Sequence, residues 1–163
     1  MTTTLQREIK KKQPFELPEQ EAMLNLLRTA DQLQIRFARL FRQFGLTPQQ
    51  YNILRILRGE GRPLPILEIA ARMITAVPGI TGLIDRLEVA SLVERQRCDH
   101  DRRVIYVAIA PRAVEILAEI DEPLVKLHKQ TLGHMTPHEL STLSELLAKA
   151  RQGPSGAVLN PEP

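Results

Sequence analysis

The chain has little cysteine and no long apolar run, and each shortage excludes a class of protein. A single cysteine, Cys98, among 163 residues rules out an internal disulfide framework and suits a reducing compartment, so we expect a cytoplasmic protein. No apolar stretch approaches the roughly 18 to 20 residues that cross a bilayer. The first residues lack the apolar core of a secretion signal, and we expect no membrane partner.

Motifs for catalysis or cofactor binding are also missing. The sequence holds no nucleophile elbow, no phosphate-cradling glycine loop and no paired acid and base in a recognisable frame. His128, His134 and His138 raise the question of a metal site, but His134 and His138 flank a helix break and no dense carboxylate group joins them. We therefore expect no enzyme, no cofactor and no metal, and we interpret the histidines as structural or solvated.

The overall composition is that of an ordinary globular protein. Hydrophobic residues make up 43% of the chain and charged residues 25%. The length is sufficient for one domain with a real core and helical extensions. A net charge of +3 permits nucleic-acid binding without requiring it, so the position of the charges matters more than their sum.

The middle of the chain predicts two short helices, a tight turn between them and a basic hairpin. Apolar residues at helical spacing predict helices over 66–73 and from about 77 to 90. Alternating apolar residues predict strands over 92–97 and 104–109, joined by the charged loop 98–103. Two such helices followed by a basic hairpin are typical of a winged helix-turn-helix.

Long amphipathic helices are predicted on both sides of this unit. One apolar stripe ends at Gly45, and a second begins at Pro111 and is interrupted at Pro123, which should kink the helix. Thr47 and Thr136 each begin a capping box, with a proline at the first helical position. This apolar surface exceeds what a small winged domain needs, so part of it should meet another chain.

The predicted fold class is therefore mainly α with a small β-hairpin wing: a winged helix-turn-helix with long terminal dimerisation helices. The predicted boundaries are a flexible arm over 1–18, a folded domain over 19–151 and a disordered tail over 152–163. Within the domain, 46–110 is the DNA-binding unit, and 19–45 and 111–151 are the dimerisation helices. The basic arm is either a solvated tail or a contact to phosphate.

Four local patterns carry a family resemblance. They are residues 46–54 (LTPQQYNIL), 80–88 (ITGLIDRLE), 92–95 (LVER) and 101–104 (DRRV). In this order and spacing the chain resembles the MarR (multiple-antibiotic-resistance regulator) family of transcription factors. The resemblance implies a homodimer on double-stranded DNA, with recognition helices in successive major grooves of a pseudo-palindromic operator and wings over the flanking minor grooves. It also implies repression that responds to a small aromatic or phenolic effector.

The candidate DNA-binding residues lie at the start of the second helix and on the hairpin. Thr81 is placed to bond a base or a phosphate, and apolar side chains before it are placed to touch thymine methyls. Arginines at the hairpin tip suit a narrow minor groove, and the family uses an aspartate two residues before an arginine to brace the tip. The full set is Thr75, Ala76, Val77, Pro78, Thr81, Arg86, Arg97, Asp101, Arg102 and Arg103.

Several neighbouring residues have other expected roles. Arg86 either anchors the hairpin or touches phosphate, and Asp85 is expected to partner a wing arginine. Phe37, Phe41 and Tyr51 either line an effector site or pack in the core. Cys98 is either a redox switch or an unreactive exposed thiol.

The sequence leaves two functions open. Val77, Gly79 and Gly82 stand where relatives commonly carry arginine or another polar residue, so the common arginine–guanine contact is missing from this face. The chain is therefore predicted to be a DNA-binding transcriptional regulator, a ligand-responsive repressor. The alternative is a dimeric interaction or DNA-architectural protein with weak sequence specificity.

Overall fold

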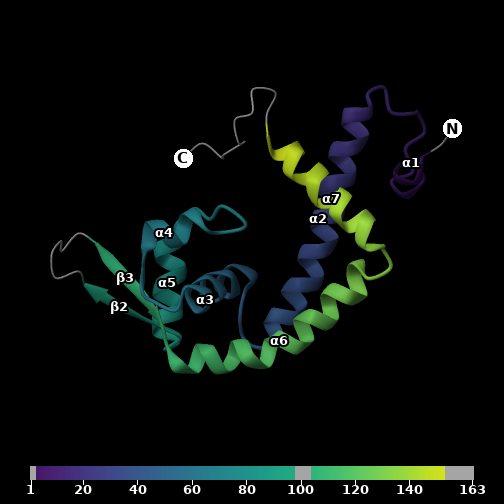
Figure 1. Ribbon diagram of the computed structural model, residues 1–163. Helices are drawn as coiled ribbons and strands as arrows, with labels where there is room; N and C mark the ends of the chain where they lie inside the picture. Colours follow the sequence, from purple (N-terminus) through teal and green to yellow (C-terminus); the bar gives the residue numbers. More distant parts are fainter. Residues whose placement is uncertain (1–2, 98–103, 153–163) are drawn as a thin grey trace. The chain divides into compact units, whose positions relative to one another are not determined.

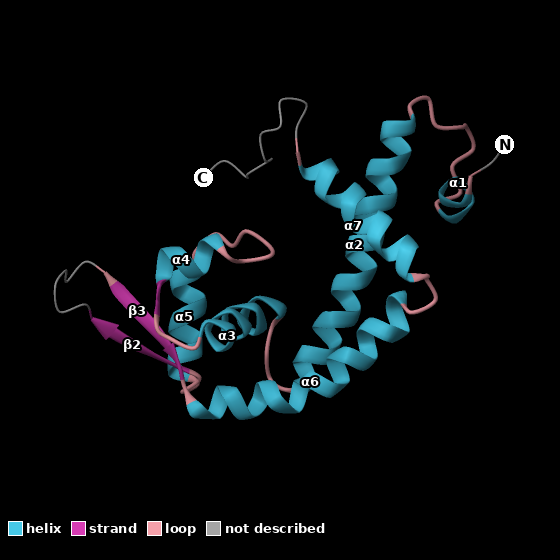
Figure 2. Cartoon of the chain, in the orientation of Figure 1, coloured by secondary structure: helices cyan, strands magenta, loops and turns pink. Residues whose placement is uncertain are grey.

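The computed structural model describes residues 3–97 and 104–152, and Figure 1 draws the rest in grey. The chain forms two compact units, Met1–Arg39 and Leu40–Pro163. Helices predominate, and one small sheet lies in the second unit (Figure 2). The elements are α1 (Thr4–Glu8), α2 (Pro18–Gln43), α3 (Pro48–Glu60), β1 (Leu64–Pro65), α4 (Ile66–Ala71), α5 (Ile80–Val89), β2 (Val93–Arg97), β3 (Ile105–Ile109), α6 (Pro111–Leu132) and α7 (Pro137–Arg151). In the described part of the chain, no helix has the length and apolar character needed to cross a membrane.

The first unit contains a short helix in the stretch that was predicted to be a flexible arm. Thr3 caps α1, because its hydroxyl accepts a hydrogen bond from the Gln6 backbone N–H. Leu5 is buried, and Glu8 forms an ion pair of 3.0 Å with Arg28 of α2. Part of the arm is therefore ordered by a cap and one apolar anchor.

The second unit is built around a three-stranded antiparallel sheet of order β1-β3-β2. Val93 pairs with Ile109 and Arg97 with Ile105, which gives the predicted hairpin. Leu64 of β1 pairs with Val107, which adds a short third strand that was not predicted from the sequence. The fully buried side chains of the core come from helices and sheet alike: Ile53, Leu54, Leu57, Leu64, Ile69, Ile84, Leu87, Val93, Val107, Leu117 and Ile120.

The helix boundaries follow their capping residues. Both predicted capping boxes are confirmed, one from Thr47 to Gln50 and one from Thr136 to Glu139. Helix α6 is continuous through Pro123, and its ribbon changes direction along its length (Figure 1). The missing proline N–H explains such a bend, because the helical hydrogen bond at that position cannot form.

The second helix of the helix-turn-helix begins later than the sequence predicted. Gly79 is its N-cap and adopts φ +76°, a left-handed conformation that a residue with a side chain rarely takes. Helix α5 therefore starts at Ile80 instead of near Val77, and α4 ends at Ala71 instead of Met73. Thr75, Ala76, Val77 and Pro78 consequently lie in the turn before the helix, not in its first turn.

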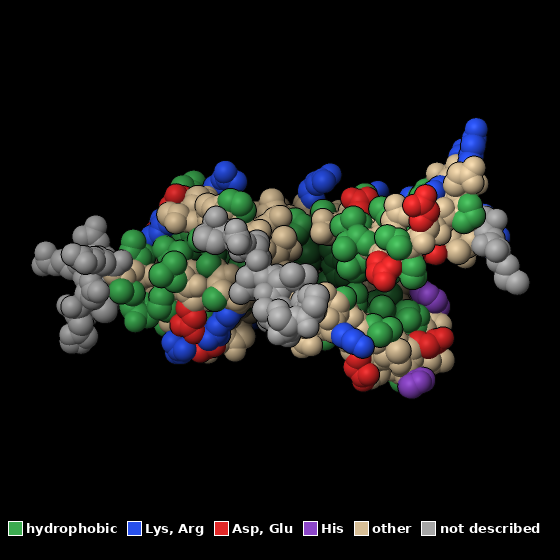
Figure 3. Space-filling model, turned by 90° about the horizontal axis from the view of Figure 1, so that it is seen from above, with side chains coloured by type: hydrophobic (Ala, Val, Ile, Leu, Met, Phe, Trp, Pro, Cys, Tyr) green, Lys and Arg blue, Asp and Glu red, His purple; other side chains and the backbone are tan. Residues whose placement is uncertain are grey.

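The long helices bury little of their apolar surface. Among the described residues, α2 has Phe41 as its buried residue and α7 has none. Large apolar side chains stay exposed on these helices and on α6: Met23, Leu24, Leu26, Leu27, Ile35, Val114, Val125 and Leu146. The space-filling view shows hydrophobic side chains at the surface beside charged ones (Figure 3).

Candidate nucleic-acid interface

The turn before α5 and the outer face of α5 carry the candidate base-reading residues. Ile84 and Leu87 bury one face of α5 in the core, which leaves Thr81 and Arg86 exposed. In the turn, Thr75, Ala76 and Pro78 are exposed and Val77 is half-buried. The structure therefore presents the predicted side chains at the surface, but from a turn followed by a helix instead of from one continuous helix.

A buried asparagine, which is not among the predicted site residues, holds the turn. Asn52 of α3 is 7% exposed, and its Oδ1 accepts a hydrogen bond of 3.3 Å from the Ile74 backbone N–H. A buried polar side chain is costly unless it is hydrogen-bonded, so this bond accounts for an amide among apolar neighbours. Its signal in the sequence is an asparagine between Tyr51 and Ile53, in the apolar run of α3.

Arg95 of β2 connects the wing hairpin to α5, the recognition helix of the helix-turn-helix. Its guanidinium lies 2.5 Å from Asp85 and 2.6 Å from Glu88, and Nη2 also donates to the Thr81 carbonyl oxygen at 3.4 Å. Burial of the side chain opposes the charged form, but hydrogen bonds to Asp85 and Glu88 raise the pKa of Arg95 above its ordinary value. The prediction that Asp85 partners a wing arginine is confirmed. Arg95 is thereby engaged by protein carboxylates.

A second ion-pair cluster fixes α4 against the end of α3. Arg72 pairs with Glu60 at 2.5 Å and also with Glu68, and Arg62 pairs with Glu60 at 2.6 Å. The hydrogen bond from Arg72 is the main reason that the pKa of Glu60 lies below its usual range. These arginines serve the helix-turn-helix geometry, since their charges face carboxylates of the same chain.

Arg86 stands apart from these clusters. Its side chain is exposed and forms no ion pair with any residue that the structure describes. The two hypotheses for it were an anchor for the hairpin and a phosphate contact. Arg95 supplies an anchor between the hairpin and α5, and the phosphate contact of Arg86 remains a prediction.

The wing tip lies outside the described residues. This concerns Cys98, Asp101, Arg102 and Arg103, so the predicted brace between Asp101 and Arg103 remains a prediction. Arg97 is the last residue of β2, where its backbone pairs with Ile105. The described strands therefore lead the hairpin toward the predicted tip.

Two of the three candidate effector residues stack on each other. The rings of Phe41 and Tyr51 are 4.1 Å apart and 14° from parallel, and both side chains are buried. Burial raises the pKa of the Tyr51 phenol, while nearby Arg58 and Arg55 lower it. This packing agrees with the core interpretation of both rings. Phe37 lies in the other unit, one helical turn earlier on α2.

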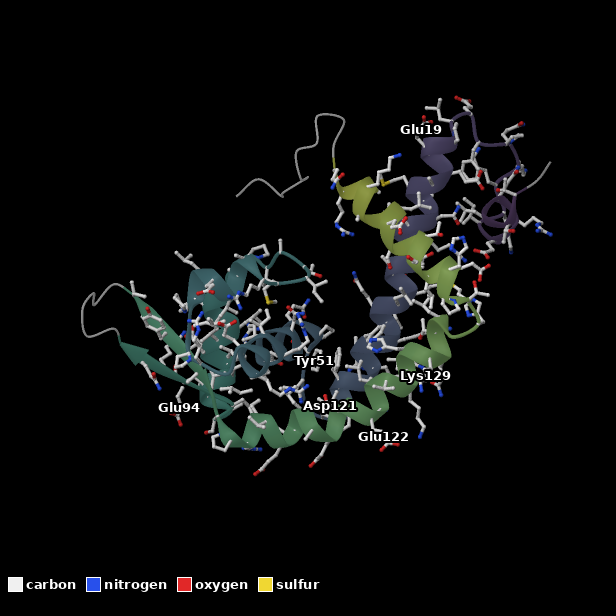
Figure 4. The ribbon with its side chains drawn as sticks, viewed as in Figure 1. Glu19, Tyr51, Glu94, Asp121, Glu122 and Lys129 are labelled. Carbon is white, nitrogen blue, oxygen red and sulfur yellow. The ribbon has the colours of Figure 1, made fainter. Side chains whose placement is uncertain are left out.

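An ion pair beside this stack joins α3 to α6. Arg58 donates two hydrogen bonds to Asp121, of 2.9 and 2.7 Å, in the forked geometry that favours arginine. Figure 4 labels Tyr51 on α3 and Asp121 on α6 where these helices face each other. The DNA-binding unit is thus fastened to α6 next to the aromatic pair.

A hollow of about 410 Å³ lies elsewhere in the second unit, between the end of α5 and β2. Its lining is mostly polar and charged: Glu88, Ser91, Val93, Glu94 and Arg95. Glu94 is labelled on the sheet in Figure 4. Acidic side chains of this kind are a poor match for the aromatic effector that the resemblance implied.

The helix-turn-helix and its antiparallel wing define a DNA-binding protein of the winged-helix class. The model of the MarR family matches residues 46–105. The chain is 39% identical to a MarR transcription factor from Planctomyces limnophilus, over 83% of this chain and 98% of that one, with a TM-score of 0.65. The chain therefore belongs to the MarR family; it is a DNA-binding transcriptional regulator and not an enzyme.

Two further similarities concern proteins whose names state a role or a ligand. The homoprotocatechuate degradative operon repressor of Escherichia coli is 25% identical over 75% of this chain and 82% of the repressor. The structure of NadR in complex with 4-hydroxyphenylacetate matches with a TM-score of 0.66 at 24% identity, over 85% of this chain and 97% of that one. At that identity, the second similarity shows the fold.

Proposed function

We propose that this regulator is a cytoplasmic homodimer that represses its target genes by binding a pseudo-palindromic operator, and that an aromatic effector releases it. The observation that carries the proposal is the contrast between two parts of the molecule. The helix-turn-helix and its hairpin are braced by Arg95, Asn52 and Arg72, whereas the long helices leave large apolar side chains exposed. A rigid helix-turn-helix together with long helices that leave apolar side chains uncovered suits a dimer on DNA.

A second copy of the chain is the proposed cover for the apolar surface. Monomeric proteins rarely expose contiguous apolar patches of more than a few hundred Å². Met23 and Leu27 of α2, Val125 of α6 and Leu146 of α7 are each more than half exposed. Residues 19–45 and 111–151 would form the dimer layer, and residues 46–110 the DNA-binding unit. A symmetric dimer of this kind would bind a pseudo-palindromic site.

On DNA, the turn and α5 would enter the major groove while the wing arginines follow the minor groove. Thr75, Ala76, Pro78 and Thr81 are exposed along the turn and helix, with Val77 half-buried among them, and the exposed Arg86 would contact phosphate. Arg97, Arg102 and Arg103 would supply the minor-groove contacts, with Asp101 as a brace. Arginine in a narrow minor groove responds to DNA shape, which suits a protein with few direct base contacts.

The effector proposal draws on the two named relatives. One represses an operon for the degradation of homoprotocatechuate, and a structure of the other holds 4-hydroxyphenylacetate. In this chain Phe41 and Tyr51, with Phe37 on the same helix, are the candidate contacts. DNA would favour one spacing of the two helix-turn-helix units of the dimer, and the ligand would favour another. Binding of the ligand would therefore shift the population of dimers away from the DNA-bound form.

The test is a competition experiment at fixed salt with the full chain. A duplex from the protein's own upstream region competes with random duplex of equal length, and light scattering gives the oligomeric state. The proposal requires a dimer that binds the specific duplex at least about a thousandfold more tightly. The effector arm repeats the assay with 4-hydroxyphenylacetate, which should lower that affinity.

One observation favours the second candidate, a DNA-architectural protein of weak specificity. No arginine or lysine lies between Met73 and Asp85, so the usual base-reading cations are missing from this edge. Equal affinity for upstream and random duplex, together with a dimeric state, would favour this candidate over the repressor.

A further inference from the structure

Ile74 has a large apolar side chain that the fold leaves exposed to solvent. It is 80% exposed and lies in the turn between α4 and α5. A single exposed apolar residue is ordinary and needs no explanation by itself. The backbone of Ile74 is constrained, because its N–H donates to Oδ1 of Asn52, a buried side chain of α3.

The turn is also held on both sides of Ile74. Before it, the backbone N–H groups of Arg72 and Met73 donate to Ile69 and Ala70, and the Arg72 side chain pairs with Glu60. After it, Gly79 adopts a left-handed conformation and begins α5. The position of the exposed isoleucine relative to the recognition helix is therefore fixed by several separate contacts.

The chemistry of this edge limits what it can recognise. From Ile74 to Thr81 no side chain is charged. This segment therefore cannot make the contact of an arginine or lysine side chain with guanine. In the major groove, the feature that an apolar side chain distinguishes is the C5-methyl group of thymine.

We propose that Ile74 is a specificity-determining residue that contacts a thymine methyl group in each half-site, and that Asn52 is its positioning residue. This inference rests on the proposed binding of an operator and goes beyond it by naming the base feature and the side chain. It predicts that the preferred DNA carries thymine at the position facing the turn.

The experiment removes that methyl group alone. The full chain first selects duplexes from a random pool, and each thymine of the selected half-site is then replaced in turn by 2′-deoxyuridine. At one position per half-site the wild-type protein should lose about fourfold in affinity for each methyl, and roughly fifteenfold when both half-sites are changed.

Variants show whether Ile74 is responsible. Ile74→Ala should bind the thymine and uracil duplexes equally, whereas Ile74→Val, which keeps a branched apolar side chain, should retain most of the difference. Val89→Ala is the matched control, because Val89 is 87% exposed but lies at the far end of α5, about 13 Å from its start. This control should discriminate as the wild type does.

Asn52→Leu tests the positioning role. Leucine is similar in size but accepts no hydrogen bond, so the Ile74 N–H loses its partner. A general loss of folding would weaken binding to both duplexes equally. A shifted Ile74 should instead reduce the ratio of the two affinities, and an unchanged ratio would remove Asn52 from the proposal.

Several outcomes would overturn the inference, and they can be told apart. Sequence-specific binding with no effect of uracil, a selected site without thymine, or unchanged discrimination by Ile74→Ala would each refute the role of Ile74 alone. Failure to select any duplex over random DNA would refute the proposed operator binding and the inference with it. Loss of a protein partner by Ile74→Ala, with DNA discrimination intact, would assign the side chain to a protein contact instead.

Discussion

Removing the charge of Arg95 should loosen the wing from the recognition helix. Arg95 lies on β2, and its two partners Asp85 and Glu88 lie on α5, at 2.5 and 2.6 Å. Methionine at this position keeps an unbranched apolar stem and removes the guanidinium. Arg95→Met therefore isolates the ion pairs from the packing of the side chain.

The expected loss of stability follows from the exposure of the three groups. The Arg95 side chain is 21% exposed, Asp85 is 55% exposed and Glu88 is 40% exposed, so solvent screens both pairs. Pairs of this kind contribute about 0.2 to 1 kcal/mol each. Without the guanidinium, repulsion between Asp85 and Glu88, three residues apart on α5, adds a few tenths of a kcal/mol to the loss of stability. We expect a loss of about 1.5 kcal/mol, which corresponds to a melting temperature lower by roughly 3 to 6 °C.

A double-mutant cycle separates this coupling from other effects. Urea unfolding at one protein concentration is measured for Arg95→Met, Asp85→Asn and the double variant, with an expected coupling of about 0.5 to 1 kcal/mol. The coupling should shrink in 1 M salt, because the pairs are partly exposed. The pair of Arg28 with Glu8, exposed on both sides, serves as the comparison and should couple less. Additive free energies for Arg95 and Asp85 would refute the brace.

Three further predictions test other parts of the chain. Gly79→Ala should destabilise by about 1 to 2 kcal/mol in thermal unfolding, because φ is +76° there; Gly59→Ala, in the helical part of α3 with open space around it, should stabilise by about 0.5 to 1 kcal/mol. Hydrogen bonds from Thr136 lower the pKa of Glu139. The ionised Glu139 side chain therefore contributes fully to the stability of the fold above the ordinary glutamate value of about 4.3, and this contribution is lost as pH falls through the lower folded pKa. When melting temperatures are measured over an acid series, the melting temperature of Glu139→Gln should fall less than that of the wild type. Arg103→Ala should weaken DNA binding and reduce the slope of log affinity against log salt by about 1.8, because the proposed dimer loses one cationic contact from each of its two copies; an unchanged slope would remove this arginine from the interface.

Local signals in the sequence predicted most of the fold. The capping boxes at Thr47 and Thr136 predicted two helix starts correctly, because a cap depends on residues within one turn. The same signal was present and overlooked at Thr3 and Gln6, where α1 begins in the predicted arm. Strand β1 was missed because two residues, one of them proline, show no alternation.

The candidate site was less predictable because its geometry depends on distant contacts. Gly79 was predicted to lie inside the second helix, whereas its left-handed conformation sets the start of α5. Asn52 and Ile74 are 22 residues apart in the sequence, and no local sequence pattern predicts a hydrogen bond between them. Asp85 was correctly predicted to partner a wing arginine, because an acidic side chain facing DNA needs a compensating charge.

Helix α3 connects the parts that an effector and an operator would each influence. Its first turns carry Tyr51, which belongs to the aromatic stack, and Asn52, which accepts a hydrogen bond from the turn before α5. Its last turns carry Arg58, which is fastened to α6, and Glu60, which holds Arg72. A ligand that displaced the stacked rings would therefore act on the same rigid helix that positions Ile74. Because packed helices move as units and do not deform continuously, a small shift of α3 against α6 would reach the DNA-binding edge without any separate pathway.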